Sequence, residues 1–283
     1  MVDSLYSRIN DDSVKIDLAF FLLLNKEYEI PCALTVYELT EISPLPIEIF
    51  WHDARHRPSK WFIETIALII KKFRQNIIIT TIEKGPFDSF KRIYHFGPIV
   101  FSKLLLPSLS ALKPEKAVYI DSGFLIHKPF SGYLENLIHN FDETKKPFGI
   151  LLSPSRRNTP YPLMHGTCAA LLTYNLELWR ASGYLRNLLV MYCQLEHKGT
   201  LLMPEQDLIE LTLMPHEIHL IDNFKINVMF LESGYNNILP PKPDAHVSKF
   251  FGSKKPWDKQ VIHHDKIYFL RCLRKMHEEL WLV

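Results

Sequence analysis

Glycine is scarce in this sequence, with 10 residues in 283, while proline is plentiful at 19. This balance argues against collagen-like and flexible repeat architectures. The four cysteines stand far apart, and no two of them have the C-x-x-C spacing. We therefore expect neither a disulfide framework nor a cysteine zinc site, but free thiols in a reducing compartment.

An excess of charge of either sign is also lacking, since 33 Lys and Arg face 31 Asp and Glu. No nucleic-acid partner is expected from that balance. No apolar run approaches the roughly 20 residues that span a bilayer. Residues 1–13 carry four charged side chains among few apolar ones, so they do not resemble a signal peptide. We expect a soluble cytoplasmic protein that at most rests on a membrane surface.

Hydrophobic residues are abundant, at 47% against 23% charged, so the chain can bury a full core. Its first half alternates strand-like runs with helix-like segments. Strands are expected at 15–24, 47–51, 76–82 and 117–120, and helices at 32–39, 61–73 and 101–112. This order predicts an α/β fold with a mixed, mostly parallel sheet flanked by helices.

The second half is less regular and shows no repeat or linker. Strands are expected at 148–153 and 168–173, helices at 176–195 and 206–213, and a proline-rich loop at 239–244. We expect one domain over residues 1–283, with an N-terminal extension at 1–14 and a C-terminal amphipathic helix at 263–283.

Three stretches can carry chemistry, each with a plain structural alternative. In VYIDSGFLI, a buried strand ends at Asp121, and ligands of open α/β sheets bind beyond such strand ends. The structural alternative is a turn, because Asp, Ser and Gly all favour turns. KFFGSKKPW at 249–257 contains a glycine, which allows the backbone to approach a ligand closely, and lysines, which can bind phosphate. The structural alternative is a solvated basic loop. PEQDLI at 204–209 places acidic residues at the start of a helix, where the helix dipole alone can explain them. The functional alternative is a polar cluster that points into a site.

The order of these stretches resembles the family 8 retaining glycosyltransferases, which include glycogenin and bacterial lipopolysaccharide galactosyl- and glucosyltransferases. The family pattern is Asp-x-Asp, Asn-Leu-x-x-Trp-Arg, Asp-Gln-Asp and His-Phe-x-Gly-x-x-Lys-Pro-Trp. Here it reads DSG at 121–123, NLELWR at 175–180, EQD at 205–207 and KFFGSKKPW at 249–257. The resemblance implies a GT-A nucleotide-sugar-binding fold, a UDP-hexose donor and retention of anomeric configuration.

The resemblance implies roles for matching residues. Asp121 matches the first Asp of the metal motif, near the donor ribose and sugar. Gly252 and Lys255 match the residues that approach the diphosphate. Gln206 matches the residue on the reactive face of the sugar, and Asp207 matches the acidic sugar contact beside it. The implied catalytic set is therefore Gln206, Asp207 and Asp121.

Further donor contacts are implied elsewhere in the chain. Lys103 stands where the family has an arginine that reaches the donor. Residues 25–28, which include Asn25 and Tyr28, match the loop that receives uracil, although its acidic residues are replaced. The asparagine of the sugar-binding Asn-x-Gly segment falls on Cys168.

The metal motif departs from the family pattern. Its second Asp is Gly123, and its His is Lys249. We therefore expect no metal cofactor. Mn²⁺ or Mg²⁺ is disfavoured, and Asp121 with His246 would be the ligands of either ion. Two interpretations stay open: an enzyme in which Lys249 and Lys255 replace the charge of the metal, or a binding or scaffolding protein that keeps the fold.

The acceptor is not defined by these residues. A bacterial surface glycan such as lipopolysaccharide, its lipid carrier or a protein all fit the resemblance. The segment 268–283 is amphipathic and basic, and it can either rest on an anionic membrane or pack on the domain. Two locations follow: the cytoplasm, including the inner face of a membrane, or a host cell into which the protein is delivered as an effector.

Overall fold

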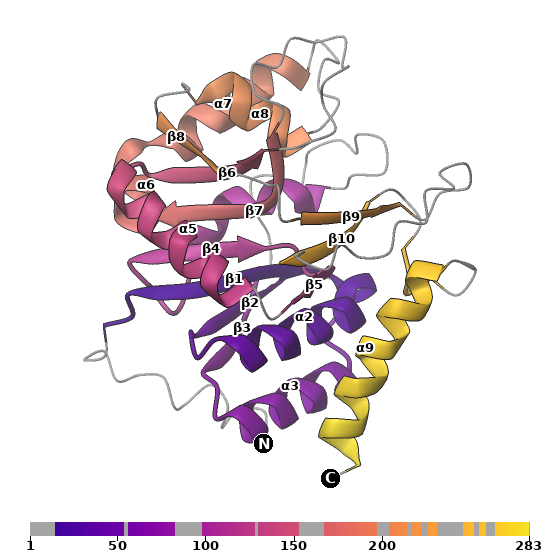
Figure 1. Ribbon diagram of the computed structural model, residues 1–283. Coiled ribbons are helices and arrows are strands. Elements are labelled where there is room, and N and C mark those ends of the chain that lie inside the picture. Colours follow the sequence, from indigo (N-terminus) through magenta and orange to yellow (C-terminus); the bar gives the residue numbers. More distant parts are fainter. Residues whose placement is uncertain are drawn as a thin grey trace.

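The computed structural model describes residues 15–53, 56–82, 98–127, 130–152, 167–196, 204–213, 217–221, 226–230, 246–251, 255–258 and 264–282. Within these ranges the strands form a larger and a smaller sheet (Figure 1). The strands of the larger sheet are β1 Leu18–Leu24, β2 Ile47–Trp51, β3 Ile77–Thr81, β4 Lys116–Ile120, β6 Phe148–Leu152, β7 Thr167–Asn175 and β8 Ile218–Ile221.

The larger sheet is mixed and mostly parallel, with the order β3-β2-β1-β4-β7-β6-β8. The strands β3, β2, β1 and β4 run parallel, whereas β7 is antiparallel to both of its neighbours. The side chains of β1 and β2 are buried along nearly their whole length, as expected for apolar strands covered on both faces. The predicted fold class is confirmed.

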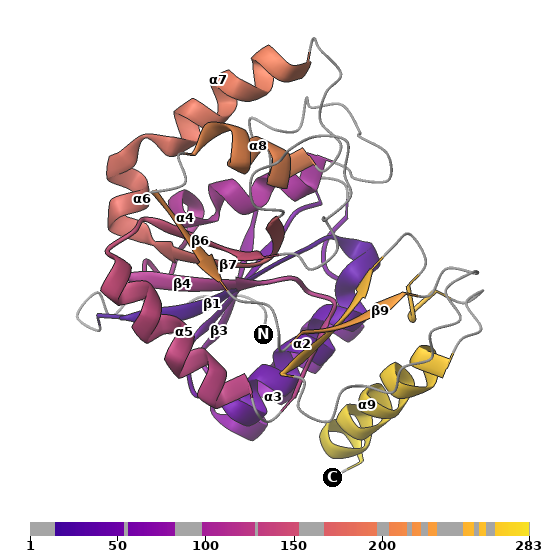
Figure 2. The same ribbon diagram turned by 45° about the horizontal axis from the view of Figure 1, so that its top comes forward.

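Helices cover both faces of this sheet. One face carries α2 (Glu29–Ile42), α3 (Lys60–Phe73) and α5 (Phe130–Thr144). The other face carries α6 (Leu176–Ser182), α7 (Tyr184–Glu196) and α8 (Pro204–Thr212), and Figure 2 shows α7 and α8 together on that side.

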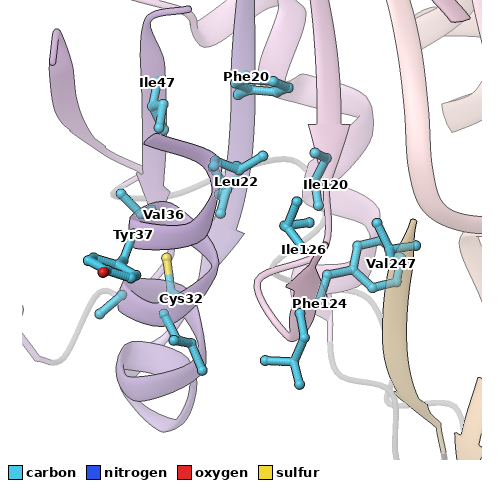
Figure 3. Close-up of a cluster of buried hydrophobic side chains, with 14 of the residues drawn as sticks. Phe20, Leu22, Cys32, Val36, Tyr37, Ile47, Ile120, Phe124, Ile126 and Val247 are labelled. Atoms are coloured by element: carbon cyan, nitrogen blue, oxygen red, sulfur yellow. The ribbon is translucent and has the colours of Figure 1, made fainter. Parts of the chain in front are cut away.

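Alternate side chains of β1 feed two separate cores. Phe20 and Leu22 pack toward α2, and Figure 3 shows Leu22 near Val36. Phe21 and Leu23 point to the opposite face and join the second core. Each face of the strand therefore has its own helical cover, and the strand ends remain as the edge where side chains from both layers can meet.

The smaller sheet consists of β5 (Phe124–Ile126), β10 (Val247–Phe251) and β9 (Ile226–Phe230). Strand β10 runs antiparallel to β5 and parallel to β9. Beside it, helix α9 (His264–Trp281) packs on α2 and α3 (Figure 1). The C-terminal helix predicted from the sequence is confirmed, while residues 1–14 and the loop at 239–244 lie outside the described residues.

Two helical expectations need correction. The segment 101–112 is mostly a 3₁₀ helix, η2 (Pro98–Leu105), followed by the short α4 (Leu106–Leu109). The expected helix at 176–195 is two helices, α6 and α7, because Gly183 adopts a left-handed φ of 68° that ends the first. In the part of the chain that the structure describes, no helix is long and apolar enough to cross a membrane.

Candidate active site

Asp121 lies directly after β4, at the carboxyl end of the parallel strands. Its backbone N–H donates to the carbonyl of Ala170 in β7 at 2.9 Å, which fixes the chain at the strand end. The Tyr119 hydroxyl donates to Oδ1 of Asp121 at 2.6 Å. The Asp121 side chain is 23% exposed, so the carboxylate lies at the edge of the site rather than deep in the core.

Two ammonium groups hold this carboxylate. Nζ of Lys249 lies 2.6 Å from Oδ2, and Nζ of Lys103 lies 3.1 Å from Oδ1. Burial favours the neutral acid and raises the pKa of Asp121. The two ammonium charges outweigh burial and bring this pKa below its usual range. Asp121 is therefore a carboxylate at neutral pH.

Lys249 reaches Asp121 from the middle of β10, where it pairs with Phe124 of β5. Its Nζ also lies over the Phe124 ring, 5.5 Å from the centroid, and its side chain is 15% exposed. A solvated basic loop was one of the two alternatives for this stretch, and for Lys249 it is corrected to a strand. Its ammonium lies on the carboxylate that the resemblance assigned to a metal.

Lys103, on η2, is more deeply placed, with a side chain 8% exposed. Its ammonium has three oxygen partners at 3.1 Å: Asp121 Oδ1, Glu205 Oε1 and the carbonyl of Ala169. Burial lowers the pKa of Lys103, but the charges of Asp121 and Glu205 raise it above the ordinary value. An ammonium has three N–H donors, so these partners saturate it.

Glu205 was missed as a site residue. The sequence left two explanations for this acid at a helix start, the helix dipole and a polar cluster in a site, and Glu205 does lie in the first turn of α8. The side chains of Glu205, Gln206 and Asp207 are all buried, a combination that the dipole does not require. The ion pair between Glu205 and Lys103 connects this turn of α8 to Asp121 through a single ammonium group.

An aromatic pair lies beside the carboxylate. Trp257 covers Gly123 so closely that a Cβ atom added there would lie 3.0 Å from its Cη2. Tyr28 meets Trp257 edge to face, with ring centroids 5.5 Å apart. Burial, followed by the charge of Asp121, raises the pKa of Tyr28 to about 12. The loop expected to receive uracil therefore lies on the Asp121 side of the fold.

The remaining predicted residues are spread more widely. Asn25 caps η1 (Lys26–Tyr28) by accepting from the N–H of Glu27 at 3.1 Å. The Lys255 ammonium donates to the carbonyl of Phe250 at 2.8 Å. Cys168 is buried in β7. Gly252 lies outside the described residues.

His246 precedes β10, and its ring lies against that of Tyr133, with centroids 5.0 Å apart. Among the described residues, no group of three or more His, Cys, Asp or Glu is arranged to hold a metal ion. The donor chemistry at Asp121 is also unsuitable, because Lys249 and Lys103 already bring positive charge to both oxygens. These residues do not fit a divalent metal.

Comparisons with known proteins agree on the fold. No protein-family model matches the chain, and no curated protein matches it in sequence. The solved structure of galactosyltransferase LgtC, in complex with donor and acceptor sugar analogues, is similar at a TM-score of 0.70 and 14% identity, over 91% of this chain and 95% of that one. Glycosyltransferase GlyE of Streptococcus pneumoniae TIGR4 has a TM-score of 0.64 at 15% identity, over 94% of this chain and 63% of that one.

A mammalian structure shares the architecture as well. Mouse xyloside xylosyltransferase 1 is similar at a TM-score of 0.57 and 12% identity, over 83% of this chain and 97% of that one. Likeness at such low identity reports a common fold. The chain therefore has the GT-A fold of glycosyltransferases, as the family resemblance implied.

Proposed function

We propose that this protein is a family 8 retaining glycosyltransferase that moves a hexose from a UDP-sugar to an acceptor hydroxyl without a metal ion. The observation that carries the proposal is the contact of 2.6 Å between the ammonium of Lys249 and Asp121. This contact puts a fixed positive charge at the strand end where sheets of this kind bind ligands. Asp121 would then orient hydroxyls of the ribose and of the sugar.

The lysines would neutralise the diphosphate leaving group. A metal ion contributes its charge to this task, and ammonium groups can supply part of that charge where little water is present. Lys249, at the exposed edge of the cluster, is the ammonium best able to contact a phosphate while still touching Asp121. Lys255 is the second. Lys103 would reach the donor only by exchanging one of its three protein acceptors, so its main role would be to hold Asp121 and Glu205.

Bond breaking and bond making would occur on the same face of the sugar. The C1–O bond to the diphosphate breaks, and its electron pair leaves with the phosphate. An acceptor hydroxyl attacks the resulting oxocarbenium-like C1 from the same side and forms the new C1–O bond. A leaving phosphate oxygen takes the acceptor proton, so no side-chain base is needed. Gln206 would steady the cation, and Asp207 would hold a sugar hydroxyl.

A turnover screen tests the proposal. UDP-glucose and UDP-galactose are incubated with the protein, in excess EDTA and separately with Mn²⁺, and release of UDP is measured. We expect UDP release that survives EDTA and that Lys249→Ala reduces. Activity that EDTA abolishes and Mn²⁺ restores would refute the metal-free mechanism, and the absence of both turnover and thermal stabilisation by any UDP-sugar would refute the donor class.

One observation favours a second candidate, a binding or scaffolding protein without catalysis. The cluster around Asp121 pairs two carboxylates with two ammonium groups, so its charges balance without any ligand. A protein that has lost its substrate can keep such a cluster for stability. Thermal stabilisation by UDP-sugars without turnover would favour binding alone.

The proposal for the acceptor and the location rests on helix α9. The exposed face of α9 combines apolar Ile267 and Leu270 with basic Arg271 and Arg274, next to Trp281. Such a face suits the anionic inner surface of a membrane, where a lipid-linked glycan or lipopolysaccharide precursor would be the acceptor. Flotation with phosphatidylglycerol vesicles tests this contact. A protein that stays unbound would favour a soluble glycan or protein acceptor, in the cytoplasm or in a host cell.

A further inference from the structure

The face of β10 turned away from Asp121 carries a second polar group. Ser248 precedes Lys249, and successive side chains of a strand point to opposite faces. The Ser248 side chain is fully buried. Its Oγ lies 2.8 Å from Nε2 of His127, the residue directly after β5. The imidazole therefore ties the strand that carries Lys249 to the end of the neighbouring strand.

Helix α9 extends this connection. The Tyr268 hydroxyl lies 3.2 Å from Nδ1 of His127, and the two rings are 6.0 Å apart. Burial, followed by nearby His246, lowers the pKa of His127, so its ring is neutral at pH 7. A neutral imidazole has one donor and one acceptor nitrogen, and it can satisfy both hydroxyls in either tautomer. Tyr268, His127 and Ser248 thus form a hydroxyl–imidazole chain from α9 to β10.

Strand β5, which anchors His127, is itself fixed by α2. The Thr35 hydroxyl donates to the carbonyl of Phe124 at 2.7 Å, and Oε2 of Glu38 accepts from the N–H of Ile126 at 2.6 Å. Both ends of this short strand are therefore held by side chains of one helix. The hydrogen bond between His127 and Ser248 therefore holds β10 against a strand that is itself fixed.

Helix α9 also holds the residue after Lys249. The ring of Phe269 meets Phe250 edge to face at 6.1 Å and lies 5.6 Å from Trp257. Ser248 and Phe250 point to one face of β10, and Lys249 points to the other. Helix α9 therefore contacts both neighbours of Lys249. Phe269 packs directly on Phe250, and Tyr268 reaches Ser248 through His127.

We propose that Tyr268, His127 and Ser248 are positioning residues that set the rotation of β10, and through it the contact of Lys249 with Asp121. The Lys249 side chain is only 15% exposed and its ammonium lies over the Phe124 ring, so the stem has little room to compensate when the strand rotates, and the contact with Asp121 lengthens. The effect of this chain of residues on the donor rests on the proposed function. The inference about the position of β10 and Lys249 does not depend on that function.

Chemical labelling tests the geometry without a nucleotide. Acetic anhydride is applied to the protein, and acetylation of Lys249 is followed by mass spectrometry. We expect Ser248→Ala to raise the rate about fivefold, the factor for one hydrogen bond, because the amine becomes less shielded. Tyr268→Phe keeps the ring and should give a smaller increase. An unchanged Lys249 rate in both variants would overturn the proposal.

Ser102→Ala is the matched control. Ser102 is also buried and also precedes a site lysine, but its hydroxyl has no hydrogen-bond partner within the described ranges. This variant should leave the labelling of Lys249 unchanged. An equal increase in the control would mean that any buried hydroxyl affects the site, and would overturn the proposal.

A double-mutant cycle on UDP affinity, measured by calorimetry, tests the functional consequence. Ser248→Ala should weaken UDP binding about fivefold in the wild-type background and less than about twofold in Lys249→Met, because the lysine through which it acts is gone. Equal weakening in both backgrounds would contradict positioning of Lys249. If the wild type does not bind UDP, the proposed donor is refuted, while the labelling result still decides the positioning role.

Discussion

Replacement of Lys249 by methionine removes the ammonium from Asp121 and keeps most of the side-chain volume. Breaking a buried ion pair by removing one partner costs about 3–5 kcal/mol. Asp121 retains Lys103 and Tyr119, and its side chain is 23% exposed, which lowers the cost. We expect a loss of about 2 kcal/mol in the free energy of unfolding at pH 7. For a chain of this size, that is a fall in Tm of about 4 °C.

The loss should depend on pH with a definite sign. The pKa of Asp121 is depressed in the folded protein, so its contribution is present above the unfolded value of about 4 and fades as the pH falls toward the folded value. In Lys249→Met this pKa rises toward the ordinary value. The difference in Tm between wild type and variant should therefore be full at pH 7 and shrink below about pH 4.

Thermal unfolding of four proteins measures this effect: wild type, Lys249→Met, Asp121→Asn and the double variant. In the Asp121→Asn background the lysine has no carboxylate at its Nζ, so its removal should cost less than about 1 kcal/mol. If Lys249→Met costs the same in both backgrounds, the stabilisation comes from packing on Phe124 and the ion-pair argument fails. The UDP affinity of Lys249→Met should also fall about tenfold, because one charge on the diphosphate is lost.

Three further changes probe the rest of the site. Gln206→Ala should lower kcat about a hundredfold with little change in donor KM, because the charge it faces develops only in the transition state; steady-state kinetics that move KM alone would point to a ground-state contact. Lys255→Ala should weaken UDP binding about tenfold by calorimetry while Tm stays within about 2 °C; wild-type affinity would remove this lysine from the phosphate site. Gly123→Ala should lower stability by about 1 kcal/mol in urea unfolding, because the Trp257 ring must shift; an unchanged midpoint would show that the ring yields freely.

The buried strands of the first half were predictable because their side chains are apolar on both faces. The expected runs at 47–51 and 117–120 match β2 and β4 to within a residue, and Asp121 follows β4 as predicted. This part of the site could be predicted from the sequence because the end of a strand and the acidic residue after it are adjacent in the chain. The pattern of neighbouring residues was sufficient to predict the strand and the position of Asp121.

The residues from other segments that contact Asp121 could not be predicted from a local pattern in the same way. Strand β5 has three residues, and its pairing strand β10 lies more than 100 residues further along the chain, so neither shows a clear period. Glu205 and Lys103 have separate local explanations, as a helix-start acid and as a helical lysine. Their contact depends on packing of α8 against η2, which sequence patterns do not encode.

The cluster at Asp121 also has a consequence for synthesis. Two of its three ion pairs join residues 102 and 128 positions apart, so these two close only after most of the chain has been made. A nascent chain that ends before α8 contains β4 and η2 and can pair Lys103 with Asp121, but it holds Lys103 without Glu205 and Asp121 without Lys249. A single pair leaves both groups short of the partners that they have in the complete fold, and buried charges need such partners, so we expect the strand end to stay hydrated until the later segments arrive. Completion of the site and final folding of the sheet edge are therefore one event.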